Sequence, residues 1–184
     1  TPNEQAHDVM NLEISENAQA ILMLTAPLLI GGKASAVPLL KPREYRDLEQ
    51  HLAVLDKQPA DFLSQEVDGL IQHCSEIHFE ADRLRKLLAR GFLLSQALDR
   101  WHSRSITVLS RLDPHYPQRL KSRLGASAPA LLYVSGNIEI LTSLDLALAV
   151  VGSRNVDAEA RDFAESIGSM SGEAGVAIVS GGAR

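Results

Sequence analysis

Two short apolar runs near the end of the sequence, at 146–151 and 176–180, restrict the possible folds more than any other feature. Each run is almost continuously apolar, which is typical of a parallel strand buried on both faces. Asp157 can cap a helix between the two runs. Apolar residues recur there at helical spacing, and they are Ala160, Phe163, Ala164, Ile167 and Met170. A strand, a helix and a strand in this order predict two parallel strands joined by a right-handed crossover.

Both apolar runs end in a glycine-containing turn, and open α/β sheets bind ligands at the carboxyl ends of their strands. Glycine lets a ligand approach the backbone, a helix N-terminus attracts anions, and arginine offers a planar fork that suits phosphate. The candidate binding residues are those of the two turns, namely Gly152, Ser153, Arg154, Asn155, Ser180, Gly181, Gly182, Ala183 and Arg184. Neither turn has the spacing of a dinucleotide-binding or Walker motif. Two tight strand–helix turns with surface arginines remain the structural alternative.

The sequence before residue 105 predicts an all-helical domain over 15–104, preceded by a loose polar tail over 1–14. Ser15 can cap the first helix, which is expected to run to Leu29 and to end at Gly31-Gly32. Four further helices are expected. The second begins at Pro42 and the third at Pro59. The fourth spans 79–90 and is stopped by Gly91, and the fifth follows it and runs to about Arg104.

Residues 105–184 have a different pattern and predict the first part of a Rossmann-like domain. Strands are expected at 106–109 and 131–134, with a loop between them that is punctuated by prolines. The expected fold class is therefore α/β, an all-helical domain followed by a parallel sheet. We expect this sheet to be incomplete, because the sequence ends on the turn after the second apolar run, before a helix that would cover the last strand.

Charge is distributed unevenly along the chain, whose formal net charge is −5. Residues 1–82 carry 5 Lys/Arg against 14 Asp/Glu, whereas residues 83–123 carry 10 against 2. The basic block includes Arg100, Arg104, Arg111, Arg119, Lys121 and Arg123. Such a block can carry the backbone of a nucleic acid, or it can balance the acidic helical domain across a domain boundary. Aromatic residues make up only 4% of the chain, which argues against rows of stacking rings.

Several classes of protein are excluded or disfavoured by what the sequence lacks. Cys74 is the single cysteine, so an internal disulfide is impossible and a reducing compartment is favoured. His73, Cys74 and His78 have no second ligand pair, so a core cysteine beside surface histidines is predicted, with no metal and no cofactor. No Gly-x-Ser-x-Gly elbow indicates an acyl-transfer enzyme. Without a signal segment or an apolar run of about 20 residues, the cytoplasm is the expected location, with no membrane partner.

Four stretches occur in an order and spacing that are typical of one family. They are 106–109 with 116–120 (ITVL and YPQRL), 129–137 (PALLYVSGN), 149–154 (AVVGSR) and 179–184 (VSGGAR). This pattern resembles the DNA-processing protein A family, DprA, also called Smf. Two departures from the family pattern are Ala160-Arg161, where the family has Tyr-Gly, and the end of the sequence, where the family continues with Gly-Ile-Asp.

The resemblance implies a non-catalytic, Rossmann-like protein that binds single-stranded DNA without sequence preference. It also implies a homodimer that loads a RecA-type recombinase onto incoming DNA during natural transformation, and often a helical, sterile-alpha-motif-like domain over 15–104. Carried over by position, the DNA pocket consists of the two glycine-containing turns.

Two other functions stay open on the residues alone. A Rossmann-like sensor of a small nucleotide-derived ligand would use the same two turns. An enzyme that cleaves the bond between a nucleotide's sugar and base needs a positioned carboxylate. This third possibility ranks last, because the nearest carboxylates, Asp157 and Glu159, fall on helix positions.

Overall fold

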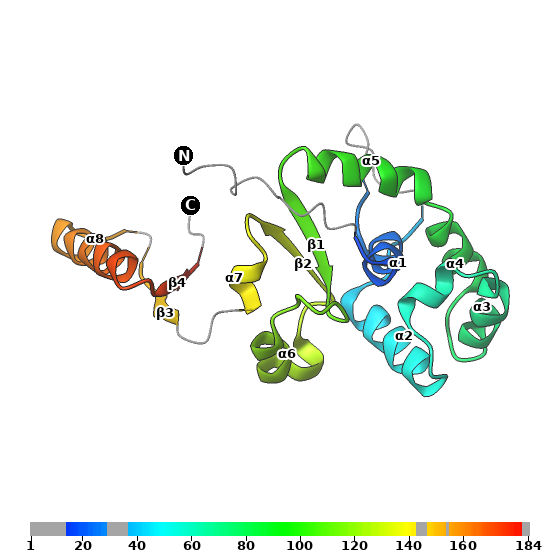
Figure 1. Cartoon of the computed structure of the whole chain (residues 1–184). Coiled ribbons are helices and arrows are strands. Elements are labelled where there is room, and N and C mark those ends of the chain that lie inside the picture. The colour runs from blue at the N-terminus through cyan, green and yellow to red at the C-terminus, as the bar shows by residue number, and fades with distance from the viewer. Residues whose placement is uncertain (1–13, 29–36, 143–146, 154, 182–184) are drawn as a thin grey trace. The chain divides into compact units, whose positions relative to one another are not determined.

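The computed structural model describes residues 14–28, 37–142, 147–153 and 155–181 (Figure 1). The chain divides into two compact units between Ile138 and Glu139. The first unit contains the predicted helices and a strand hairpin, and the second contains the predicted strand–helix–strand element. Each unit is described by itself below.

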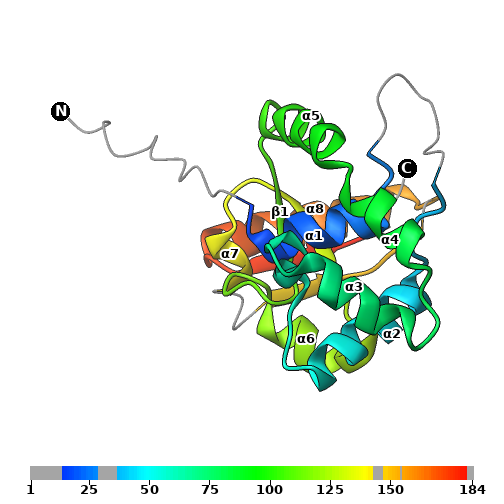
Figure 2. The same cartoon turned by 90° about the vertical axis from the view of Figure 1, so that its right-hand side faces the viewer.

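The helix α1 (Glu16–Thr25) is the centre of the first unit, with α5 above it and α2 below it in Figure 2. The Ser15 hydroxyl accepts a hydrogen bond from the Ala18 N–H at 3.1 Å, which confirms the predicted cap. The helix ends at Thr25, earlier than the predicted Leu29. Pro27 is the physical reason, because a residue before proline avoids helical geometry and Ala26 is extended, with φ −91° and ψ 140°.

The remaining helices of this unit follow the predicted order with two differences. Their bounds are α2 Pro42–Val54, the 3₁₀ helix η1 Pro59–Leu63, α3 Val67–Ser75, α4 Ala81–Leu88 and α5 Gly91–His102. The single helix predicted to begin at Pro59 is thus two helices, η1 and α3, because Ser64 is extended (φ −81°, ψ 170°) and interrupts the run. Gly91 opens α5, whereas the prediction used it only to stop the preceding helix.

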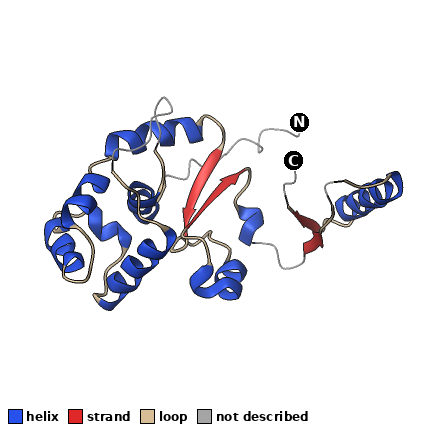
Figure 3. Cartoon of the chain, turned by 180° about the vertical axis from the view of Figure 1, so that it is seen from behind, coloured by secondary structure: helices blue, strands red, loops and turns tan. Residues whose placement is uncertain are grey.

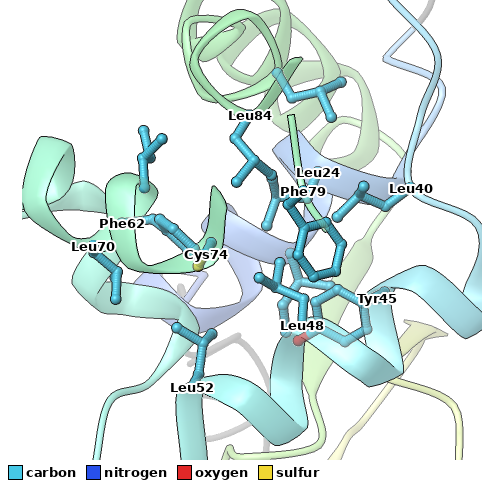
Figure 4. Packing of buried hydrophobic residues seen from close by; sticks show 13 residues of the cluster. Leu24, Leu40, Tyr45, Leu48, Leu52, Phe62, Leu70, Cys74, Phe79 and Leu84 are labelled. Atoms are coloured by element: carbon cyan, nitrogen blue, oxygen red, sulfur yellow. The ribbon is translucent and has the colours of Figure 1, made fainter. Parts of the chain in front are cut away.

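Apolar side chains of these helices form one large core cluster (Figure 4). Its buried members are Ile21, Leu24, Leu40, Tyr45, Leu48, Leu52, Phe62, Leu70, Ile71, Cys74, Phe79, Leu84 and Leu87. Figure 4 shows these side chains converging between the helices, so the Cys74 thiol is part of the packing. Burial raises the pKa of this thiol to about 11, which keeps it protonated and unreactive near neutral pH.

A hairpin of two antiparallel strands, β1 (Ile106–Ser110) and β2 (Leu131–Ser135), packs onto the helices. Val108 of β1 belongs to a second buried cluster, whose other members are Leu22, Met23, Ala26, Leu28 and Leu94. The predicted domain boundary at 104–105 therefore lies inside the first compact unit, because the hairpin and the helices share a core.

The segment between β1 and β2 was expected to be a loop, and this prediction is wrong. It contains the helix α6 (Gln118–Leu124), followed by a short 3₁₀ turn, η2 (Gly125–Ser127). Pro117 immediately precedes α6, where its fixed φ of −59° suits a helix start, so a residue taken as loop punctuation begins a helix. The upper part of the basic block accordingly lies on a helix.

The second unit contains α7 (Glu139–Thr142), β3 (Ala147–Val150), α8 (Ala158–Glu173) and β4 (Ala177–Ser180) (Figure 3). The two strands are parallel, as predicted, and pair in register from Ala147 with Ala177 to Val150 with Ser180. Asp157 caps α8, since its Oδ1 accepts a hydrogen bond from the Ala160 N–H at 2.8 Å.

The predicted burial of these two strands is wrong for this structure. Leu148 of β3 is 41% exposed, and Val179 of β4 is 51% exposed. The helix α8 packs against β4, and the described residues of this unit provide no second layer over the strand pair. One helix cannot cover both faces of a sheet, so the apolar side chains stay in contact with solvent.

Amides in β3 and β4 should therefore exchange with solvent at least about 100-fold faster than amides in α1. The strand pair opens easily because little apolar surface is buried around it, whereas Ile21, Leu22 and Leu24 of α1 are almost completely buried. Hydrogen–deuterium exchange of the 184-residue chain, resolved by peptide or by residue, measures this difference. Equal protection of α1 and of the strand pair would contradict the expectation and would mean that another surface covers β3 and β4.

Candidate functional site

The parallel pairing of β3 and β4 brings the two predicted turns to one edge of the strand pair. Val150 and Ser180 are register partners, so Gly152 and Gly181 leave the sheet at neighbouring positions. Gly152, Ser153, Asn155, Ser180 and Gly181 are described and exposed. The other four candidate residues, Arg154, Gly182, Ala183 and Arg184, lie outside the described residues.

Neither Gly152 nor Gly181 is required by the local structure. A Cβ atom built at either position meets nothing within 4 Å, and neither residue has the positive φ that favours glycine. The backbone at Gly152 and at Gly181 is therefore open on the side where a side chain would stand. This is the property that close approach of a ligand to the backbone needs.

The N-terminus of α8 is less favourable to an anion than the sequence suggested. The Asp157 carboxylate already accepts from the Ala160 N–H, and Glu159 adds a second negative charge to the first turn. Both charges interact favourably with the positive end of the helix dipole and compete with a bound anion there. Among the described groups at this edge, the turn backbone and the Ser153 and Ser180 hydroxyls are the ones left for an anion.

Part of the basic block makes contacts within the first unit. This agrees with the predicted alternative in which the block balances the acidic helical domain. Arg111 pairs with Glu49 of the acidic helix α2 and also donates to the Ala128 carbonyl at 3.1 Å. The Lys121 Nζ donates to the Arg111 carbonyl at 3.2 Å. The Arg111–Glu49 pair joins the segment after β1 to α2, and the other two contacts hold that segment together. In contrast, Arg104 and Arg123 are exposed, and their side chains make no hydrogen bond or ion pair within the described part of the chain.

Two arginines that the sequence did not single out turn out to be structural. Arg83 binds both carboxylate oxygens of Glu44, at 2.7 and 3.1 Å, and also donates to the Pro38 and Leu39 carbonyls. Arg90 is only 6% exposed and donates to the Met23 carbonyl at 2.9 Å and to the Ala26 carbonyl at 2.6 Å. Nothing in the local sequence marks these roles, since the partners lie 39 to 67 residues away.

The three residues considered for a metal site are a core cysteine and two surface histidines, as predicted. Cys74 is fully buried, and its neighbours His73 and His78 are exposed. Among the described residues, no three His, Cys, Asp or Glu side chains come together as a metal ion would need. No described helix is both long enough and apolar enough to span a bilayer.

The fold is of the mixed α/β class, with helices and two small sheets. A helical unit with a strand hairpin precedes a parallel strand pair, whose carboxyl edge is the candidate ligand site. Residues 107–184 match the model of the family described as DNA recombination-mediator protein A, and this region of the chain is similar to that family. No curated protein and no solved structure matches the chain significantly. The family match confirms the resemblance seen in the sequence and includes both turns.

Proposed function

We propose that this protein binds single-stranded DNA at the edge formed by the two glycine-containing turns. In this proposal it is a non-catalytic, cytoplasmic recombination mediator, which protects incoming DNA and loads a RecA-type recombinase during natural transformation, and which acts as a homodimer. The observation that carries the proposal is the placement of Gly152 and Gly181 at one edge of a parallel strand pair, inside the region that matches the family.

The chemistry of this edge supports phosphate binding in place of bond cleavage. The open backbone at both glycines leaves room for a phosphodiester, and Ser153 and Ser180 bring hydroxyls to the same edge. Arg154 and Arg184, by their positions in the sequence, supply the guanidinium groups that pair with phosphate oxygens. Asp157, the carboxylate nearest in sequence to the first turn, is engaged as the cap of α8 and is therefore not free to act as a general acid or base.

A small nucleotide-derived ligand is the second candidate for the same edge. The turns offer backbone groups, two serine hydroxyls and two arginines, which is enough for one phosphate group as well as for a strand. Salt dependence separates the candidates. The affinity for single-stranded DNA falls steeply with salt, because each phosphate contact contributes about −0.7 to the slope of log K against the logarithm of the salt concentration. The affinity for a small ligand depends only weakly on salt.

Replacing Arg154 with alanine should weaken binding of a single-stranded oligonucleotide roughly tenfold and should reduce the salt slope by about one phosphate contact. Fluorescence anisotropy with a labelled oligonucleotide, repeated at several salt concentrations, measures both quantities. Arg161→Ala is the matched control, because it removes the same charge from an exposed position on α8. If the two variants bind DNA equally well, Arg154 is not part of the site. If the parent chain binds a mononucleotide and no DNA, the small-ligand function replaces the proposal.

A further inference from the structure

The tryptophan of this chain forms an aromatic pair on the surface of the first unit. Trp101, the sole tryptophan, lies near the C-terminal end of α5, and Tyr133 lies in the middle of β2. Their ring centroids are 5.2 Å apart, and the ring planes meet at 76°. Tyr133 is the register partner of the buried Val108, which places its side chain on the face of the hairpin that packs against the helices.

Packing in the core accounts for the position of Trp101 but not for that of Tyr133. Trp101 contacts the second core cluster and is partly buried there, as a large apolar ring at the end of a helix should be. Tyr133 is 51% exposed, and its hydroxyl makes no hydrogen bond with the described residues. The other two tyrosines, Tyr45 and Tyr116, are almost completely buried. The ring of Tyr133 is therefore held in place by Trp101 and is also open to solvent, as a ring that binds a ligand must be.

The charges next to this pair are mainly positive. Arg100, His102 and Arg104 flank Trp101 in sequence and are exposed. Asp99 is the only acidic residue between positions 91 and 112. The Arg104 side chain has no hydrogen bond or ion pair within the described residues, so its charge is available to a ligand. Aromatic rings together with unpaired cations are the surface that single-stranded nucleic acids bind, since bases stack on rings and phosphates pair with arginine.

We propose that Trp101 and Tyr133, with Arg104, form a second contact for single-stranded DNA, at which a base stacks on the aromatic pair. The inference rests on the proposed function and adds a base-stacking contact in the first unit to the phosphate-binding turns in the second. Because every base has a π-face, such a contact adds affinity without reading the sequence. It needs only one pair of rings, so the small aromatic content of the chain does not count against it.

Trp101 itself reports the contact, because it is the sole tryptophan and its emission has one source. A thymidine oligonucleotide of 20 residues should quench this emission as it binds. A 20-residue strand of abasic sites has the same phosphates but no bases, and it should quench the emission much less at equal saturation. Anisotropy of a labelled strand, recorded in parallel on the 184-residue chain, reports binding wherever it occurs.

Four variants separate the stacking contact and the charge contact from effects on folding. Tyr133→Leu keeps an apolar side chain but removes the ring, and it should weaken binding of the thymidine strand about tenfold while leaving binding of the abasic strand unchanged. Tyr133→Phe keeps the ring and should bind like the parent. Arg104→Ala should lower the salt slope by about 0.7 for both strands, whereas Arg43→Ala, at an exposed position on α2, should leave it unchanged. The thermal unfolding midpoint of each variant verifies that it is folded.

Each outcome has one meaning. Quenching by the thymidine strand that depends on bases, lost in Tyr133→Leu and kept in Tyr133→Phe, supports the stacking contact. If anisotropy detects DNA binding while Trp101 emission and the affinity of Tyr133→Leu are unchanged, the stacking contact is refuted and the turns remain the proposed site. If anisotropy detects no DNA binding, the proposed function fails and the stacking contact fails with it.

Discussion

Replacing Arg90 with methionine should lower the free energy of unfolding by about 3 kcal/mol. The Arg90 guanidinium supplies donors to the Met23 and Ala26 carbonyls at the C-terminal end of α1, where helix carbonyls have no partner within the helix. Methionine fills much of the same space but donates nothing, so the Met23 carbonyl would lose its donor in a buried place and the Ala26 carbonyl would keep only the Leu28 N–H. Some of the loss is offset, because burial of the arginine is itself costly and lowers its pKa.

Urea unfolding of the parent and the variant, followed by far-ultraviolet circular dichroism, measures this difference. Arg85→Met is the matched control. Arg85 lies on α4 and its side chain is 46% exposed, with Asp68 and Asp82 as partners, so its loss should cost less than about 1 kcal/mol. Equal destabilisation by the two substitutions would show that the end of α1 does not depend on Arg90.

Local signals in the sequence predicted most of the elements, because their causes are local. Ser15 and Asp157 cap α1 and α8 as expected, and the two apolar runs form a parallel pair. The errors come from local signals that compete. Pro27 ended α1 before the expected Gly31-Gly32, and Pro117 began a helix in a segment expected to be a loop. Proline both ends and starts helices, and single-sequence patterns do not separate these roles.

Contacts between distant segments could not be predicted in this way. Arg90 and Arg83 bind carbonyls and a carboxylate far away in the sequence, and Arg111 reaches Glu49 from the other side of the expected domain boundary. The basic block therefore contained residues of two kinds, which composition cannot distinguish. Arg111 and Lys121 hold the first unit together, whereas Arg104 and Arg123 face solvent.

The candidate site was predicted as far as its place in the fold. Two turns at the carboxyl ends of parallel strands must be neighbours, and the register of Val150 with Ser180 confirms this. The electrostatics of the site were harder to predict, because the same Asp157 that starts α8 also brings negative charge to its N-terminus. The aromatic pair could not be predicted, since Trp101 and Tyr133 meet only when the hairpin packs against α5.

Acidification from pH 5 to pH 2 should remove about 2 kcal/mol of stability through one carboxylate, Glu44. The hydrogen bonds from Arg83 lower the pKa of Glu44 to about 2, from an ordinary value of 4.5, against the opposing effect of burial, and the Lys41 N–H lowers it further. The folded state therefore binds this proton less readily than the unfolded state. The stabilisation is complete above about pH 4.5 and is lost as the pH falls through about 2. The full pKa difference would correspond to about 3 kcal/mol, and partial exposure of both side chains reduces it.

The measurement is a comparison of urea unfolding between the parent and Glu44→Gln at several pH values, because other carboxylates affect both proteins alike. The parent should be about 2 kcal/mol more stable than the variant at pH 6, and the difference should vanish near pH 2. Glu66→Gln is the control, since Glu66 is 87% exposed and contacts Lys57 only at 4.0 Å, and this variant should stay within about 0.5 kcal/mol of the parent throughout. A difference between parent and Glu44→Gln that does not change with pH would contradict the expectation. It would mean that Glu44 stabilises the first unit by packing and capping, and that its charge pair with Arg83 contributes nothing.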